Sequence, residues 1–406
     1  MRAGIGAEAF WREGYAFFFG FARRLAEGAG YVDASGAATA FRVPLYPLVL
    51  AGLTGGDRAF WPVLLFQAAV STGTVACAAL LARDWFGPRA ALCAAAICAV
   101  YPYYLIHDTS LAETGLFTFL TALGVWLAVR ARARGSARIA AAAGLALGLA
   151  VLTRATIAPF VPVAAAWLAF VPRRRGGGQW IAAGTLLAVA ALTLTPWLAY
   201  SQQVTGRASL GTEFGAALFG GNNDRTFSHY PAGSIDASRG EAFAALSADD
   251  DAELARLRGD EAATSDWYEA RGRAWIAAHP GAAAWGALRK LGAAFGPLPS
   301  PRKGAPGNAA HALSYGPIAL LALVTAWRRR RWREHLPIYA LFAIFAAITA
   351  VLWGHTAHRS FLDVYLIVFA APAILAAVDR RRRSAGPPRE PDGVARTLAV
   401  GARANR

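Results

Sequence analysis

The stretch "RARARGSARIAAAAGLALGLAVLTRATIAPFVPVAAAWLAFVPRRRGGG", residues 130–178, decides how this chain folds, because it holds a long apolar run between two arginine clusters. The run, residues 139–171, is interrupted by "LTRAT", so it forms either one tilted helix or two short ones. Arginine-rich loops stay on the cytoplasmic side of a membrane. Both clusters can lie there only if the run crosses an even number of times. We therefore predict two short membrane helices, with Arg154 between them on the outer side.

The composition indicates a polytopic membrane protein. Of 406 residues, 56% are hydrophobic and 16% are charged, whereas soluble domains have roughly 25% charged residues. The net charge of +16 comes from arginines clustered beside apolar runs, which is typical of cytoplasmic membrane loops and argues against nucleic-acid binding. Cys77, Cys93 and Cys98 lie inside apolar runs and predict buried hydrophobes, with no disulfide or metal framework. The scarcity of lysine suggests a bacterial source.

Seven further apolar runs are about 20 residues long, the length that crosses a bilayer. They cover residues 60–82, 88–106, 110–130, 180–199, 312–327, 335–353 and 361–378. With the two short helices they predict about nine crossings in an all-α bundle. The arginine clusters at 328–333 and 380–383 then lie inside with the others.

This count divides the chain into five parts. Residues 1–58 form outer juxtamembrane helices and a re-entrant segment, and residues 59–200 hold six crossings. Residues 201–311 form an outer segment, in agreement with their 12 acidic and 11 basic residues. Residues 312–379 hold three crossings, and residues 380–406 form a basic cytoplasmic tail. Because the count is odd, residues 1–58 lie outside without a helix or signal peptide to carry them there, so we expect either a missing first transmembrane helix or a wrong count.

Residues 7–31 alternate aromatic and charged residues in a pattern that suits a helix at the membrane surface. Glu13 lies in this helix, where periodicity alone explains it as a solvated acid.

The next motif along the chain is "PLYP", which follows Arg42 and Val43 and in which Pro44 and Pro47 bracket Tyr46. The two fixed φ angles predict a turn just outside the bilayer that points residues 48–53 back toward it.

A second group of polar residues lies between two predicted spans at the outer mouth of the bundle. It contains His107, Asp108 and Glu113, and Glu113 falls in the first turn of the following helix. A carboxylate at a helix start gains from the helix dipole, so a capping role explains Glu113 as well as a functional one does. Charged groups near membrane level are costly, which makes Glu113 a functional candidate.

The third group is cationic. Arg154 interrupts an apolar run, which costs several kcal/mol unless an anion or a cavity compensates it; a lipid phosphate or one of the carboxylates could do so. His355, His358 and Arg359 lie on the same side. A His-x-x-His pair without a third ligand is poor evidence for zinc and favours phosphate contact or interfacial anchoring. Acids, arginines and histidines on one face suit a reaction at an anionic lipid headgroup.

Six motifs occur in an order that resembles the GT-C type membrane glycosyltransferases that use polyprenyl-phosphate sugars, such as protein O-mannosyltransferases and lipid A aminoarabinose transferases. They are "ARRLAEGAGY" (22–31), "FRVPLYPLVLAGL" (41–53), "YPYYLIHDTSLAET" (101–114), "LTRAT" (152–156), "WIAAHPGAAAWGALRKL" (275–291) and "HRSFLDVYLIVFAAP" (358–372). Two departures are Ala155, where the family has proline, and Val364-Tyr365, in a neighbourhood where proline is usual.

The resemblance implies a GT-C-like bundle and inverting transfer of a sugar from a polyprenyl-phosphate donor to a hydroxyl of a lipid, glycan or protein acceptor. The reaction would occur on the outer face of a bacterial inner membrane. Glu13 is the only acid near the position of the family's catalytic base, offset by about one residue, and Asp108 and Glu113 match its second acidic element. Four residues would bind the donor phosphate: Arg42, Arg154, His358 and Arg359. Three others would shape the donor cavity: Pro44, Tyr46 and Pro47. No cofactor is required, and the scheme is compatible with a divalent cation.

Two other classes of function stay open at this point. A transporter or flippase of a lipid-linked sugar would show inverted repeats with broken helices, and no convincing repeat is present. A non-catalytic membrane scaffold would tolerate replacement of Glu13, Asp108 and Glu113 together. An oligosaccharide polymerase or ligase uses the same donor class and is hard to separate by sequence. Residues 201–311 should hold much of the acceptor specificity, without a recognisable motif.

Overall fold

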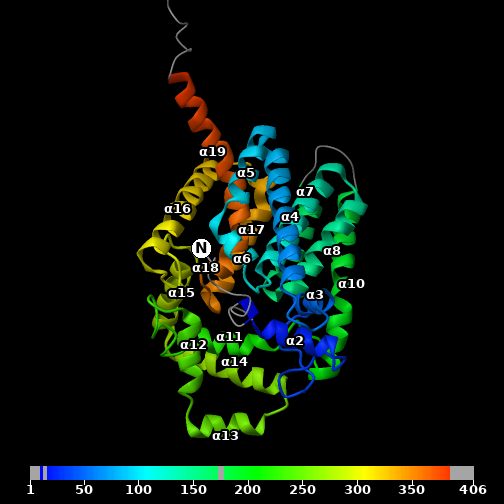
Figure 1. Ribbon diagram of the computed structural model, residues 1–406, viewed down its shortest axis with the longest axis vertical. Coiled ribbons are helices and arrows are strands. Elements are labelled where there is room, and N and C mark those ends of the chain that lie inside the picture. Colours follow the sequence, from blue (N-terminus) through cyan, green and yellow to red (C-terminus); the bar gives the residue numbers. More distant parts are fainter. Residues whose placement is uncertain (1–9, 12–15, 172–177, 385–406) are drawn as a thin grey trace, which may run out of the picture.

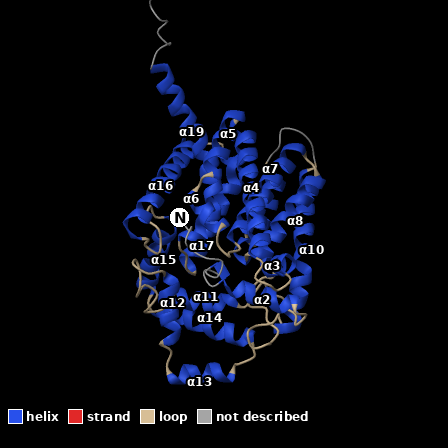
Figure 2. Cartoon of the chain, viewed as in Figure 1, coloured by secondary structure: helices blue, strands red, loops and turns tan. Residues whose placement is uncertain are grey.

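The computed structural model describes residues 10–11, 16–171 and 178–384, and this part of the chain is almost entirely helical, with no strand beyond one isolated bridge (Figure 2). Six helical segments are long and apolar enough to cross a membrane: α4 (Phe60–Phe86), α7 (Thr114–Arg134), α10 (Gln179–Thr205), α16 (Gly304–Arg329), α17 (Trp332–Val351) and Thr356–Ser384. The last of these joins α18 (Thr356–Arg359), η2 (Ser360–Leu362) and α19 (Asp363–Ser384). The predicted all-α polytopic membrane fold is confirmed.

The remaining predicted crossings are helical but irregular. The run at 88–106 is a bent pair, α5 (Pro88–Ala99) and α6 (Pro102–Asp108), with 54° between the two helices. Counting that pair as one span gives seven. The other two predicted crossings, α8 (Ala137–Thr153) and α9 (Phe160–Phe170), are shorter than a usual span. Among the described residues, six or seven segments are thus long and apolar enough to cross a membrane. The other two of the nine predicted crossings are the short helices α8 and α9.

The helix break at Arg154 is confirmed. Ser136 caps α8 by accepting a hydrogen bond from the Ile139 N–H, and α8 ends where Arg154 adopts an extended conformation. A 3-10 turn, η1 (Ala155–Ile157), and Pro159 then lead into α9. From this break the Arg154 side chain reaches the start of α7, where it contacts Glu113 and Thr114.

Small residues let α8 pack closely between its neighbours. A Cβ added at Gly144 would collide with the Leu186 backbone of α10, and one added at Gly148 would lie 2.8 Å from the Thr193 side chain. On the other side, a Cβ at Gly124 of α7 would lie 2.7 Å from the Leu147 side chain. Close backbone approach at small residues is the usual way in which membrane helices associate.

The two ends of the bundle carry different elements (Figure 1). The arginine-rich C-terminal end of α19 projects from one end, where α7 and α8 also meet. The opposite end carries α11 (Glu213–Gly221), α12 (Ile235–Ala244), α13 (Ala248–Arg256) and α14 (Glu261–Ala278), followed by α15 (Pro280–Phe295). We call residues 201–311 the outer segment, after the side that the arginine distribution predicts for it.

The N-terminal part contains two short helices next to the outer segment, α2 (Ala16–Ala26) and α3 (Leu45–Thr54). The ten-residue α3 is too short to cross a bilayer and ends at Gly55, whose φ of 59° suits glycine. Where the sequence predicted a turn at Pro44–Pro47, α3 has already begun at Leu45, because proline is accepted in the first turn of a helix. Tyr46 is 1% exposed and contacts the Phe18 ring edge-on at 5.3 Å.

Candidate active site

The predicted outer-face residues come together around an ion pair between Glu113 and Arg154. Glu113 precedes the first turn of α7, and Arg154 lies at the break between α8 and α9. Arg154 Nη2 donates to Glu113 Oε1 at 2.6 Å and to Thr114 Oγ1 at 3.1 Å. The side chains are 13% and 5% exposed. The partner of Arg154, which the sequence left open between a lipid phosphate and a carboxylate, is therefore Glu113 in this structure.

Two more contacts hold the arginine. Its guanidinium lies 4.8 Å from the centre of the Phe117 ring, and Nη1 donates to the His358 carbonyl at 3.4 Å. The site thus joins the start of α7, the α8–α9 break and α18. Glu113 Oε2 is buried without a hydrogen-bond partner among the described residues. This oxygen is an acceptor available to a bound hydroxyl or water.

The two predicted histidines lie next to each other beside this pair. The rings of His355 and His358 have centroids 3.9 Å apart, and His355 Nε2 lies 3.2 Å from Asp236 Oδ2 of α12. His355 Nδ1 accepts a hydrogen bond from the Ala357 N–H. A neutral His355 must therefore carry its proton on Nε2 and donate it to Asp236.

Asp236 is held in its ionised form by these neighbours. Burial alone would raise its pKa, but the hydrogen bond from His355 and the positive charges of His355, His358 and Arg239 together lower the pKa below its usual value. Arg154 and Arg42 are also close enough to His358 to act on it electrostatically. The structure therefore brings Arg42, Arg154 and His358 into one electrostatic cluster, with Asp236 as its acidic partner from the outer segment.

Arg42 has a carboxylate partner that the sequence did not indicate. Its guanidinium forms an ion pair with Glu213 of α11 and lies 4.8 Å from the centre of the Phe17 ring. Arg239 lies 3.9 Å from the same Glu213 oxygen. Through Glu213, Arg42 thereby joins the N-terminal part of the chain to the outer segment.

Arg359 lies deeper in the bundle than the sequence predicted. It is fully buried and forms an ion pair with Asp363, which also accepts a hydrogen bond from the Tyr101 hydroxyl at 2.9 Å. The Tyr315 ring centre is 3.8 Å from its guanidinium. Arg359 therefore has an internal carboxylate partner, and its contact with the donor phosphate stays a prediction.

Asp108 ends α6 and Glu113 directly precedes α7, and the two carboxylates have different neighbours. A Cβ on Gly115 would lie 3.6 Å from Asp108 Oδ1, and the Asp108 carboxylate also has a hydrogen bond to Ser71 of α4. The Gln67 amide donates to the Asp108 carbonyl at 2.8 Å and to the Ser110 carbonyl at 2.9 Å, which holds the intervening turn. Glu13, the predicted base, lies outside the described residues.

Besides Asp363, the acids that sequence reasoning missed belong to the outer segment. Besides Asp236 and Glu213, Glu261 of α14 accepts hydrogen bonds from Thr39, from the Ala40 N–H at 2.9 Å and from Thr212 at 3.2 Å. Each of these acids lies at or near a helix start in a segment of balanced charge. No local pattern distinguishes them from the other acids of that segment.

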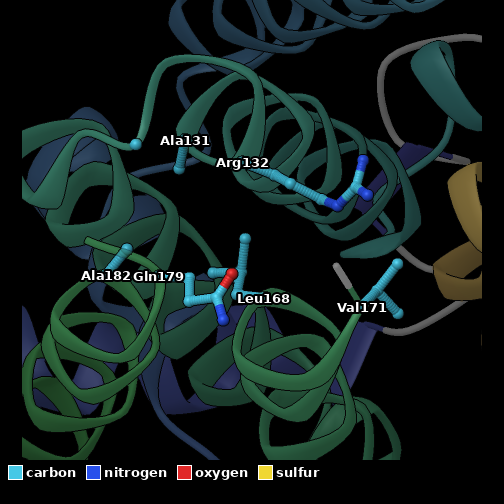
Figure 3. Close-up of a pocket in the computed structure, with 7 residues that line it drawn as sticks. Ala131, Arg132, Leu168, Val171, Gln179 and Ala182 are labelled. Carbon is cyan, nitrogen blue, oxygen red and sulfur yellow. The ribbon is translucent and has the colours of Figure 1, made fainter. Parts of the chain in front are cut away.

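No group of three or more His, Cys, Asp or Glu side chains with metal-binding geometry occurs in the part of the chain that the structure describes. At the arginine-rich end, a cavity of about 10 Å³ lies between α7, α9 and α10, with Arg132, Leu168 and Gln179 in its lining (Figure 3). That volume has room for one water molecule at most. The cavity is therefore too small for a substrate.

Residues 43–200 match the family model described as dolichyl-phosphate-mannose-protein mannosyltransferase. The matched region contains Asp108, Glu113 and Arg154 and ends before the outer segment. The resemblance to GT-C glycosyltransferases that the motifs indicated is thereby confirmed over these residues. A comparison with curated proteins finds no match.

Two crystal structures of the Archaeoglobus fulgidus oligosaccharyltransferase are similar to this chain, one in complex with Zn and sulfate and one tethered through a disulfide bond to an acceptor peptide containing the NVT sequon. The sequence identity is 17% in both cases, and the matches cover 86% of this chain and 42% of each of the others. The chain therefore spans about two fifths of their length. The TM-scores of 0.47 and 0.48 are too low to support a functional conclusion.

Proposed function

We propose that this protein is an inverting glycosyltransferase that moves a sugar from a polyprenyl-phosphate donor to an acceptor hydroxyl on the outer face of a bacterial inner membrane. The observation that carries the proposal is the Glu113–Arg154 pair. It lies within the residues that match the mannosyltransferase family, and Arg154 contacts the His358 carbonyl beside the His355–Asp236 pair, which belongs in part to the outer segment. One carboxylate oxygen of the pair has no partner among the described residues.

The proposed chemistry needs an acid and a cation at this place. The acceptor oxygen attacks the anomeric carbon, the bond from that carbon to the phosphate oxygen breaks, and polyprenyl phosphate leaves with the bonding electrons. A carboxylate takes the acceptor's proton, which makes the oxygen a better nucleophile. Cationic groups stabilise the charge that grows on the phosphate as the bond breaks.

In this scheme Glu113 holds Arg154 through Oε1, and its Oε2 accepts a hydrogen bond from a neighbouring hydroxyl of the acceptor, so that the proton of the attacking hydroxyl goes to the base. Arg154 and His358 face the leaving phosphate, and Arg42 supports that cluster. Glu13 remains the proposed base, with Asp108 beside the acceptor site. Pro44, Tyr46 and Pro47 would shape the wall of the donor cavity. The reaction as written requires no cofactor.

The test uses the full-length protein in lipid nanodiscs with radiolabelled undecaprenyl-phosphate mannose, glucose or aminoarabinose, and a bacterial envelope fraction as the acceptor source. We expect transfer of at least one sugar, and a loss of about 100-fold or more in Glu113→Gln. Glu334→Gln, which changes a half-exposed carboxylate of α17, is the matched control and should retain full activity.

A parallel experiment separates the enzyme from a transporter. The same protein in sealed vesicles is given a fluorescent undecaprenyl-phosphate sugar in one leaflet. Transport of this lipid between leaflets without any transfer of sugar would contradict the proposal and support a flippase. Transfer without transport is the expected outcome.

A further inference from the structure

A cleft in the outer segment has the size and chemistry of a ligand site, although none of the predicted catalytic or donor-binding residues lines it. Its volume is about 440 Å³, within the usual range for small-molecule pockets. Residues of α11, α12, α13 and α14 line it, at the end of the molecule away from the arginine-rich end (Figure 1). The lining combines two aromatic rings, two carboxylates and two guanidinium groups: Phe219, Trp275, Asp224, Asp250, Arg225 and Arg271.

The polar groups are already oriented by their neighbours. The Trp275 Nε1–H donates to Asp224 Oδ1 at 2.7 Å. Arg271 forms an ion pair with Asp250 and lies 4.7 Å from the Trp267 ring centre. Asp250 in turn completes the capping box with Ser247 at the start of α13. Side chains held in this way lose little conformational freedom when they bind a ligand.

The charges of the lining determine what chemistry the cleft accepts. Two carboxylates and two guanidinium groups sum to zero, so neither a phosphate nor an ammonium ligand gains net attraction. A carboxylate only accepts hydrogen bonds and a guanidinium only donates them, whereas a hydroxyl does both. Vicinal hydroxyls can therefore pair with both kinds of group. The faces of indole and phenyl rings suit the apolar C–H face of a sugar ring.

We propose that this cleft binds a neutral saccharide. If the proposed glycosyltransferase function is correct, this saccharide is the glycan part of the acceptor. The same helices connect the cleft to the candidate active site: Glu213 and Phe219 lie six residues apart on α11, as do Asp236 and Ala242 on α12. Six helical residues span about 9 Å. The cleft therefore lies within two helical turns of Glu213 and Asp236, the two acids that join the outer segment to Arg42 and His355.

The binding test needs no donor and is independent of catalysis. The full-length protein in nanodiscs is mixed with mannobiose, chitobiose or cellobiose at millimolar concentration, and contact is measured by saturation-transfer difference NMR. We expect at least one disaccharide to bind, and Trp275→Ala to weaken that binding at least tenfold. Trp285→Ala removes an exposed tryptophan of α15 outside the cleft and should leave binding unchanged.

A second variant covers the case in which Trp275→Ala disturbs the fold. Ala278→Phe adds bulk to the exposed lining of the cleft without removing a contact and should block binding. Ala282→Phe, at an exposed position of α15, should not. The proposal is overturned if no disaccharide binds, if both cleft variants bind the disaccharide as well as the wild type does, or if only glycerol phosphate or an unglycosylated peptide binds. Saccharide binding by a protein without transferase activity would overturn the proposed function and leave this inference intact.

Discussion

Arg154 Nη2 lies 2.6 Å from Glu113 Oε1, although 41 residues separate them along the chain. Both side chains are largely buried. The positive charge that interrupts an apolar run is therefore compensated inside the protein. A buried pair of this kind is costly to break on one side only, because the other charge is left unpaired.

Replacement of Arg154 by methionine should lower the free energy of unfolding by about 3–5 kcal/mol, since Glu113 would remain as a buried, unpaired charge. Adding Glu113→Gln to this variant should restore part of the loss, which is measured as a double-mutant cycle by thermal unfolding in nanodiscs. The control is the exposed pair Arg207–Asp266, whose loss should cost at most about 1 kcal/mol. Strictly additive effects at Glu113 and Arg154 would show that the two residues do not interact.

Replacement of Asp236 by asparagine should remove a pH-dependent contribution to stability. Its folded-state pKa lies below the ordinary value of 3.8, so the wild-type contribution is complete above about pH 4 and is lost as the pH falls through the folded-state pKa. The melting-temperature difference between wild type and Asp236→Asn should shrink as the pH is lowered from 5 toward 2. Asp249→Asn on α13 serves as the control. A difference that stays constant over this pH range would contradict the prediction.

Lys290 should make the protein more stable at alkaline pH. It is 1% exposed, and its Nζ donates to Asn222 Oδ1 at 3.0 Å and to the Ala350 carbonyl at 3.1 Å. Burial lowers the pKa of Lys290 to about 8, so the unfolded chain binds more protons than the folded one between about pH 8 and 10.5. Stability should therefore rise with pH over that interval.

The measurement is the melting temperature at pH 7.5, 8.5 and 9.5, compared with Lys290→Met. The variant should lose that rise with pH and, at pH 7.5, should be less stable by ~1–3 kcal/mol because Asn222 and the α17 carbonyls lose a donor. Lys303→Met, at an exposed position, is the control. An equal rise in all three proteins would assign the pH dependence to other groups.

Gly144 should tolerate no side chain. A Cβ there meets the Leu186 backbone of α10, which cannot move aside as a side chain can, so Gly144→Ala should separate α8 from α10 and lower the melting temperature. Gly184→Ala on α10 is the matched control, because no atom lies within 4 Å of its added Cβ. That substitution should be neutral or stabilising, since alanine favours a helix by about 1 kcal/mol over glycine. Equal melting temperatures for the two variants would refute this packing.

Much of the fold could be predicted because hydropathy and helix breaks are local properties. The apolar runs predicted the long apolar helices and the short pair α8 and α9, although not α11 to α15 of the outer segment, and Arg154 marked the break between α8 and α9. The "PLYP" stretch predicted a short segment that cannot span the membrane, and α3 has that length. One prediction was wrong: the expected turn at Pro44–Pro47 already belongs to a helix from Leu45 onward. The 88–106 run is apolar enough for one span, as predicted, but it bends by 54° between α5 and α6, which hydropathy does not report.

Hydropathy and charge patterns predicted the class of fold, the arginine clusters and part of the candidate site, including Glu113 and Arg154. The ion-pair partners follow only from the packed structure: Arg154 with Glu113, His355 with Asp236, and Arg42 with Glu213. The periodicity of apolar residues predicts which face of a helix is apolar. It does not predict which other helix packs against that face, or how far along the bundle each helix is placed. Ion-pair partners depend on the rotation and depth of packed helices far apart in the chain, and these follow from close packing of the whole bundle.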